Sequence, residues 1–503
     1  MQSQCKSSSP HSSNFRVSLF RSGEMVRLFL TLSPAISRFN IYPGISILAT
    51  NPSLRLQKHH QLKTKTPAFS LIPPSSSPNF QRTPSNSTGT RTFSSPKSGN
   101  SSFGDNLVVL GIETSCDDTA AAVVRGNGEV LSQVISSQAD LLAQYGGVAP
   151  KQAEEAHSRV IDKVVQDALD RANLSEKDLS AVAVTIGPGL SLCLRVGVRK
   201  ARRVAGEFNL PMVGVHHMEA HALVARLVEQ ELSFPFMALL ISGGHNLLVL
   251  AHKLGQYTQL GTTVDDAIGE AFDKTAKWLG LDMRRSGGPA VEELALEGDA
   301  KSVKFNVPMK NHKDCNFSYA GLKTQVRLAI EAKDIDCKHP LSSATNEDRR
   351  NRADIAASFQ RVAVLHLEEK CERAIDWALE LEPSIKHMVV SGGVASNKYV
   401  RLRLNNIVKN KELKLVCPPP SLCTDNGVMV AWTGLEHFRV GRYDPPPPAI
   451  EPEDYVYDLR PRWPLGEEYA KGRSDARSMR TARIHPSLTS IIRADSLQQQ
   501  TQT

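Results

Sequence analysis

Between residues 106 and 250, short apolar runs alternate with segments of helical spacing. LVVLGIET (107–114) and AVAVTIGPGL (181–190) are long enough for buried strands that end in turns. AAAVVRGNGEVLSQVI (120–135) predicts two strands joined by a Gly-Asn-Gly hairpin turn. EEAHSRVIDKVVQDALDRA (154–172) and LRVGVRKARRVAGEF (194–208) place apolar residues on one helical face. The pattern therefore predicts an α/β domain.

Two later segments of the chain form a weak internal repeat. FMALLISGGHNLLVL (236–250) and HMVVSGGVASNKYV (387–400) each give a strand and then Ser-Gly-Gly. Glycines let the backbone approach a ligand closely and turn its N–H groups toward phosphate. Together with the loop in GIETSCDDTA (111–120), these segments predict phosphate recognition by loops from two lobes. We expect a two-lobed α/β fold of the actin-like ATPase and sugar-kinase type, with a ligand cleft between the lobes.

The first hundred residues differ from the rest in composition. They are rich in Ser and Pro and carry 12 Lys and Arg but a single acid, Glu24. Such a segment cannot bury enough apolar surface to fold alone, and it is typical of an organellar transit peptide. MVRLFLTLSPAISRF (25–39) favours a mitochondrial presequence, with a plastid address as the alternative.

The expected organisation follows from these patterns. A disordered transit peptide and linker cover residues 1–104, and a first α/β lobe covers 105–235, completed by about 425–445. A second α/β lobe covers 236–424, and 466–503 form a polar C-terminal tail. No stretch is apolar and long enough to span a bilayer.

The distribution of charge and the spacing of the cysteines argue against several kinds of binding surface and structural site. The net charge of +8 belongs to the first hundred residues, because the remainder has 48 basic and 51 acidic residues. Any nucleic-acid surface must therefore be a local patch. The eight cysteines are scattered and form no CxxC pair, which argues against a disulfide scaffold or a four-cysteine zinc site and suits a reduced compartment.

The strongest chemical signal is the segment VHHMEAH (215–221). His217 and His221 are four residues apart, on one face of the helix that follows, and can share a metal ion. Glu219 is not where the general base of an HExxH protease would be. Asp425, in the turn of PPPSLCTDNG (418–427), is a candidate third ligand. A structural histidine pair and a helix-capping Asp are the alternatives.

With these pieces assembled, the chain resembles the tRNA threonylcarbamoyladenosine synthase family, formerly described as O-sialoglycoprotein endopeptidases. The matching stretches run in family order over roughly residues 107–435. They are GIETSCDDTA, GPGL, VHHMEAH, LISGGHN, DDAIGEAFDKTAKWLGLD, SGGP, NFSYAGLKT, VSGGVASN and CTDNG. The basic N-terminal segment is similar to that of the organellar branch of the family.

The resemblance implies a defined reaction. A threonylcarbamoyl group passes from threonylcarbamoyl-AMP to N6 of adenosine 37, next to the anticodon, in tRNAs that read codons starting with A. It also implies the roles of individual residues. The metal ligands fall on His217, His221 and Asp425, the substrate loop on Leu240, Ile241, Ser242, Gly243 and Gly244, further substrate contacts on Asp273, Gly288 and Asn397, and a residue needed for activity on Asp117.

Acyl transfer to a weakly nucleophilic amine needs charge stabilisation and a base. Two imidazoles and a carboxylate suit one Fe(II) or Zn(II) ion more than Mg(II). The backbone of Ser242–Gly244 would cradle the adenylate phosphate. Asp117 is the candidate general base or orienting group; the alternative is that Asp117 and Asp118 stabilise their loop.

A tRNA would need a basic patch on this body. The helix at 194–208 carries Arg195, Arg199, Lys200, Arg202 and Arg203. Arg284 and Arg285 extend the patch, in the segment Met283–Ser286 where bacterial relatives are shorter. The alternative is a solvated helix face.

Three rival functions remain: a metallopeptidase, an actin-like small-molecule kinase and a non-catalytic assembly protein. A separate enzyme must supply threonylcarbamoyl-AMP, because no second catalytic domain is visible in the sequence. The resemblance further implies a homodimer. The N-terminal segment predicts a location in the mitochondrial matrix, with or without attachment to the inner membrane, and a plastid is the alternative.

Overall fold

The computed structural model divides the chain into two compact units, Met1–Ser94 and Ser95–Thr503. It describes residues 17–22, 25–30, 105–138, 149–282, 286–335, 339–452 and 455–472. In the first unit, β1 (Val17–Ser22) pairs antiparallel with β2 (Met25–Leu30). The rest of the expected transit peptide and linker, up to residue 104, lies outside the described residues.

The second unit contains a five-stranded sheet in the order β5-β4-β3-β6-β7. Its central strand β3 pairs antiparallel with β4 and parallel with β6, and all of its residues are buried. The strands predicted from the apolar runs, including the Gly-Asn-Gly hairpin, are confirmed. The bounds are β3 Val108–Glu113, β4 Asp118–Arg125, β5 Val130–Ser137, β6 Ala181–Gly187 and β7 Met212–His216.

A six-stranded sheet, in the order β12-β11-β8-β9-β10-β13, repeats this arrangement. Its first strand β8 pairs antiparallel with β9 and parallel with β11, as β3 does with β4 and β6. The first five strands of the two sheets therefore have the same order and directions. The bounds are β8 Phe236–Ile241, β9 Asn246–Lys253, β10 Gln256–Thr262, β11 His387–Ser391, β12 Lys414–Val416 and β13 Glu467–Glu468.

This topology confirms the α/β class with two similar lobes. The two Ser-Gly-Gly segments follow β8 and β11, which are neighbours in the second sheet, so both loops belong to the second lobe. The repeat relates one whole sheet to the other. Gly392 shows how closely the two loops lie, since a Cβ there would be 2.3 Å from the carbonyl oxygen of Ile241.

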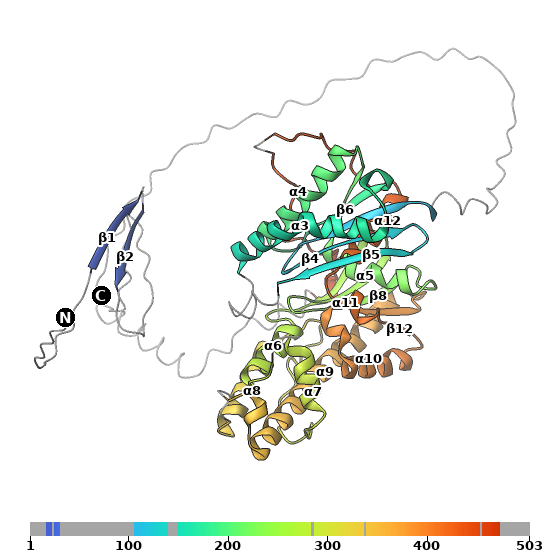
Figure 1. The fold of residues 1–503 in the computed structure, drawn as a ribbon. Helices are drawn as coiled ribbons and strands as arrows, with labels where there is room; N and C mark the ends of the chain where they lie inside the picture. Colours follow the sequence, from blue (N-terminus) through green and yellow to red (C-terminus); the bar gives the residue numbers. More distant parts are fainter. Residues whose placement is uncertain are drawn as a thin grey trace, which may run out of the picture. The chain divides into compact units, whose positions relative to one another are not determined.

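Helices form three layers around the two sheets (Figure 1). α3 and α4 pack on one face of the first sheet, and α6 to α10 pack on the far face of the second. α5 and α12 lie between the sheets, in one apolar cluster with residues of both. The bounds are α3 Pro150–Ala172, α4 Ser191–Glu207, α5 His217–Val228, α6 Ile268–Trp278, α7 Gly287–Ala295, α8 Ala320–Ala332, α9 Asn346–Leu381, α10 Lys398–Asn410, α11 Pro420–Cys423 and α12 Gly427–Arg439.

The end of the described chain differs from the expected polar tail. Glu467–Glu468 form β13, which pairs in parallel with β10, and Leu465 just before it is 5% exposed. The tail expected from residue 466 therefore begins with ordered residues, and 473–503 lie outside the described part. In the parts of the chain that are described, no helix combines the length and apolar character needed to cross a membrane.

Candidate functional site

The two predicted histidines lie on the first turns of α5, which begins directly after β7. His216 caps this helix: its Nδ1 accepts hydrogen bonds from the backbone N–H groups of Met218 (3.1 Å) and Glu219 (3.4 Å). His217 is then the first helical residue, and His221 lies one turn later on the same face. Their buried rings are 4.7 Å apart and perpendicular.

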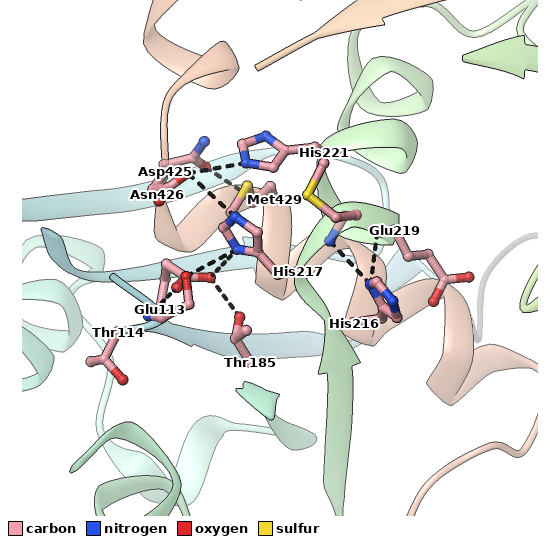
Figure 2. A network of polar contacts seen from close by, with 12 residues as sticks. Glu113, Thr114, Thr185, His216, His217, Glu219, His221, Asp425, Asn426 and Met429 are labelled. Atoms are coloured by element: carbon pink, nitrogen blue, oxygen red, sulfur yellow. Dashed lines mark hydrogen bonds and ion pairs between the residues drawn. The ribbon is translucent and has the colours of Figure 1, made fainter. Parts of the chain in front are cut away.

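Asp425 reaches this histidine pair from the loop before α12. Its Oδ1 lies 3.0 Å from Nε2 of His221 and 3.6 Å from Nε2 of His217 (Figure 2). The helix cap of α12 is the neighbouring Asn426, whose side chain accepts from Met429 N at 2.8 Å. Asp425 is therefore not a capping residue and is available as a ligand.

These three side chains fit a divalent metal ion. One ligand atom of each lies within 4.8 Å of the others. Atoms bonded to Zn(II) at ~2.1 Å in a tetrahedral site are about 3.4 Å apart, which matches the spacing around Asp425. Burial lowers the pKa of His217, but Asp425 and Glu113 outweigh it and raise the pKa to about 9. The same excess of negative charge favours a bound cation.

Glu113 is the residue that sequence reasoning missed. It ends β3, is fully buried, and its Oε2 lies 3.2 Å from Nδ1 of His217. Thr185 Oγ1 donates to this oxygen at 2.6 Å, and Ser115 N donates to Oε1 at 2.5 Å. A carboxylate can only accept here, so Nδ1 of His217 carries the proton and Nε2 is left facing Asp425. An acid inside the apolar run LVVLGIET was the available signal.

Glu219 has a structural role, and its side chain points away from the metal group (Figure 2). Its carboxylate accepts from Tyr257 OH (2.7 Å) and Gly255 N (2.9 Å), and its Oε2 lies 2.9 Å from His437 Nε2. All of these partners lie on other elements: the turn between β9 and β10, β10 itself, and α12. Glu219 therefore ties α5 to the second sheet and is already fully engaged.

The predicted substrate loop lies beside the metal group. Leu240 and Ile241 are buried at the end of β8, where they form its last two residues. Ser242 closes the turn, since its N–H donates to His245 O at 2.8 Å and its hydroxyl accepts from His245 N at 3.1 Å. The His245 ring is 6.0 Å from that of His217.

Gly243 and Gly244 form the tip of this turn. Both are exposed, and no atom lies within 4 Å of the position that a Cβ would take on either residue. Their backbone is therefore accessible to a ligand next to the metal ligands.

Asp117 lies in the loop between β3 and β4. His157 holds this loop, with Nε2 3.2 Å from Cys116 O and Nδ1 2.7 Å from Thr119 Oγ1. Burial raises the pKa of Asp117, and the charge of Asp425 adds to the effect. Burial and Asp117 together raise the pKa of the adjacent Asp118 to about 7.

Asp273, Gly288 and Asn397 belong to helices of the second lobe. Asp273 Oδ1 accepts from Gly287 N at 2.7 Å, at the start of α7, and an added Cβ on Gly288 would meet open space. Burial raises the pKa of Asp273, and the charge of Asp117 contributes, so the two carboxyl groups lie within electrostatic reach.

The side chain of Asn397 makes more hydrogen bonds within the protein than the sequence suggested. It caps α10, with its Oδ1 accepting from Val400 N at 2.9 Å and its Nδ2 donating to Gln360 Oε1 at 3.1 Å. One amide hydrogen and one lone pair remain for a ligand.

Acidic partners offset much of the predicted basic patch on α4. Arg195 pairs with Glu154 at 2.8 Å, and Asp162 pairs with Lys200 at 2.8 Å and with Arg203 at 2.6 Å. Arg202 pairs with Glu451, and Arg199 lies 6.0 Å above the ring of Tyr457. These ion pairs join residues far apart in sequence. Arg284 and Arg285 lie outside the described residues.

Comparison with known proteins adds to this geometry. The model of the family "tRNA N6-adenosine threonylcarbamoyltransferase" matches residues 129–432. A protein of Arabidopsis thaliana named as a probable mitochondrial tRNA N6-adenosine threonylcarbamoyltransferase is 92% identical over 95% of this chain and all of that one. A mitochondrial protein of the same name from Xenopus tropicalis is 43% identical over 66% of this chain and 83% of its own length. A Rhizobium etli relative is 44% identical, covering 71% of this chain and 94% of its own.

Replacing Glu113 with Gln tests the role of this buried carboxylate. We expect Glu113→Gln to weaken Co(II) binding roughly 10- to 100-fold, because the charge that orients His217 is removed. Titration followed by the visible Co(II) absorption gives the Kd. Glu368→Gln is the matched control, since Glu368 is a buried carboxylate paired with Arg403 on α10. Equal Kd values for both variants and wild type would contradict the assignment.

Proposed function

Because the chain belongs to the tRNA N6-adenosine threonylcarbamoyltransferase family, we propose that it uses threonylcarbamoyl-AMP as the donor and modifies adenosine 37 of tRNAs that read codons starting with A. The enzyme is an acyltransferase that acts on tRNA, and it is mitochondrial. The observation that carries the finer proposal is the position of the exposed Gly243–Gly244 backbone beside His217, His221 and Asp425. The glycine turn suits the phosphate of an adenylate donor, and a bound metal ion would stabilise charge on its acyl group.

The donor is a mixed anhydride of a carbamic acid and AMP. Its phosphate carries negative charge, and backbone N–H groups at a glycine turn can donate to it without a side chain in the way. We place the phosphate at Gly243 and Gly244. Asp273 and the remaining hydrogen-bonding capacity of Asn397 would bind the ribose hydroxyls, from α6 and from the start of α10.

His217, His221 and Asp425 would hold one Fe(II) or Zn(II) ion, which supplies charge stabilisation for the donor oxygens. The protein's own contribution is orientation. Glu113 fixes the tautomer of His217. The helix that carries the histidines, α5, and the helix that follows Asp425, α12, are both packed between the sheets. The side chains that would bind the metal are therefore held in fixed positions by the packing of the two lobes when the donor binds.

The attacking N6 amine loses a proton as the new carbon–nitrogen bond forms and AMP leaves. Asp117 would accept that proton or orient the amine; it lies in the loop after β3 and interacts electrostatically with Asp425. Burial raises its pKa, which makes it a stronger base than an exposed Asp.

The rival functions fit the site less well. A metallopeptidase would need a free carboxylate next to the metal, and Glu219 is engaged by Tyr257, Gly255 and His437. A small-molecule kinase would need no group such as His217, His221 and Asp425. We further propose that a separate enzyme makes threonylcarbamoyl-AMP and that the protein acts as a homodimer.

Loss of the metal ligands should abolish transfer. The protein is mixed with an adenylate-forming partner enzyme, ATP, threonine, bicarbonate and an unmodified A-decoding tRNA, and the digested tRNA is analysed by mass for threonylcarbamoyladenosine. We expect product with wild type and only background with His217→Ala or Asp425→Ala. His252→Ala is the control, because His252 pairs with Glu382 and Thr258. ATP turnover without tRNA would favour the kinase instead.

Asp117→Asn tests the base. The substitution keeps the shape of the side chain and removes its basicity, so we expect kcat to fall about 10²-fold or more while KM for tRNA and Tm stay near wild type. A role in stabilising the loop predicts the reverse, a lower Tm with kcat preserved. Full transfer activity in Asp117→Asn would therefore remove the catalytic assignment.

The basic face of α4 is tested by charge changes in both directions. We expect Arg199→Glu with Arg203→Glu to weaken tRNA binding and to flatten the plot of log Kd against log salt, because phosphate contacts are lost. Asp162→Asn should tighten binding at low salt, since it releases Lys200 and Arg203 from their ion pair. Unchanged affinities in both variants would place the tRNA elsewhere.

A further inference from the structure

Residues 455–472, here called the strap, contact the apolar cores on both sheets and the core between them. Tyr457, Leu459 and Trp463 pack against the cluster beneath α3 and α4. Leu465 is buried in the cluster that holds α5 and α12, and Tyr469 packs on the cluster of the second lobe. A single extended segment therefore spans both lobes.

The strap is bonded to the first lobe next to the metal group. Arg460 N donates to Ile186 O at 2.8 Å, and Pro461 O accepts from Gly189 N at 3.2 Å. The residue after Gly189 donates its N–H to Ser115 O at 2.8 Å. Ser115 Oγ in turn lies 3.2 Å from Nδ1 of His217. The strap thus supports the loop that backs the first histidine.

A second contact is more direct. His216 Nδ1 accepts from the first backbone N–H groups of α5, so its other nitrogen, Nε2, carries the hydrogen. Nε2 lies 3.0 Å from the carbonyl oxygen of Trp463, and the two rings are 4.5 Å apart. One imidazole therefore links the strap to the helix turn that presents His217.

The other end of the strap supports the same helix through the second sheet. β13 pairs with β10, and Tyr469 N donates to Gln259 O at 2.8 Å. Gly466 has a φ of 85°, and a Cβ there would lie 2.2 Å from the carbonyl oxygen of Tyr257. Tyr257 OH donates to Glu219, on the first turn of α5.

We propose that the strap is a positioning element for the metal-bearing helix. Trp463 acts through His216, and Gly466 acts through Tyr257 and Glu219, so that two contacts near the middle of the strap fix the first turn of α5. The imidazole of His217 is thereby held against Asp425. Only the activity readout of this inference rests on the proposed function, because helix order and metal affinity are measured without tRNA or donor.

Two glycines of the strap provide a matched test. Gly466→Ala places a methyl group against Tyr257 O in an unfavourable backbone conformation and should lift β13 from β10. Gly472→Ala is the control, since its Cβ would meet only Leu260 O at an ordinary 3.5 Å. We expect Gly466→Ala to speed hydrogen exchange at residues 217–220 and to weaken Co(II) binding roughly tenfold. Gly472→Ala should match wild type in both.

His216→Asn provides a second variant that does not depend on the strap's own folding. Asn is a good N-cap and can still accept from the first N–H groups of α5, but it is too short to reach Trp463 O in the same position. We expect the far-UV circular dichroism and Tm to stay near wild type while Co(II) affinity falls and kcat drops without a change in KM for tRNA.

The possible outcomes distinguish a failure of the strap proposal from a failure of the proposed transfer reaction. Weaker Co(II) binding in Gly466→Ala and His216→Asn, with Gly472→Ala normal, supports the proposal even if no transfer is detected. Wild-type Co(II) affinity and wild-type exchange at 217–220 in both folded variants would overturn it. Loss of transfer alone, with metal binding intact, would also overturn it, because the strap would then act on substrate and not on the helix.

Discussion

The packing of α5 and α12 between the two sheets is the constraint on which the site depends. Small residues allow this close approach: a Cβ on Gly434 would lie 2.3 Å from that of Ala183, and one on Gly111 would lie 2.3 Å from Ala431 N. Interiors packed at this density deform little. His217 begins one of these helices and Asp425 directly precedes the cap of the other, so the core itself sets the distance between the two ligands.

Charge balance is the second requirement of this arrangement. Glu113 is fully buried, and a buried carboxylate is costly unless it is hydrogen-bonded and compensated. Thr185, Ser115 N and His217 provide three such partners. Burial raises the pKa of Asp425, but His217 and His221 outweigh it and hold this pKa well below its usual range. The two carboxylates hold an extra proton on His217, and a divalent cation bound between the three side chains would replace that positive charge.

The sequence predicted the features that depend on local pattern. Strand and helix periodicity located β3 to β6, β8 and α3 to α5, and the spacing of His217 and His221 predicted that their side chains lie together. It could not decide whether Asp425 was a cap, because Asn426 is an equally good cap by residue type. Glu113 was overlooked for a similar reason, since an acid that ends an apolar run is also what a strand leaving the core would show.

Long-range contacts account for what the sequence could not predict. In the sequence, the basic residues of α4 look like an open patch. In the fold, Glu154 and Asp162 of α3 form ion pairs with them. Residues 466–472 of the strap look like part of a polar tail in the sequence, because their ordering depends on single backbone bonds and on a strand of two residues, neither of which leaves a periodic pattern. Only the fold brings Trp463 to His216.

The site also divides its tasks between packed and open elements. Among the candidate ligands, His217 and His221 are buried and Asp425 is half-buried, whereas Gly243 and Gly244 are exposed with free space around them. Such a division suits the proposed reaction, in which a reactive donor is oriented against fixed groups and AMP leaves. A phosphate bound at the glycine turn, as proposed, would not disturb α5, because the closure of the turn depends on Ser242 and His245.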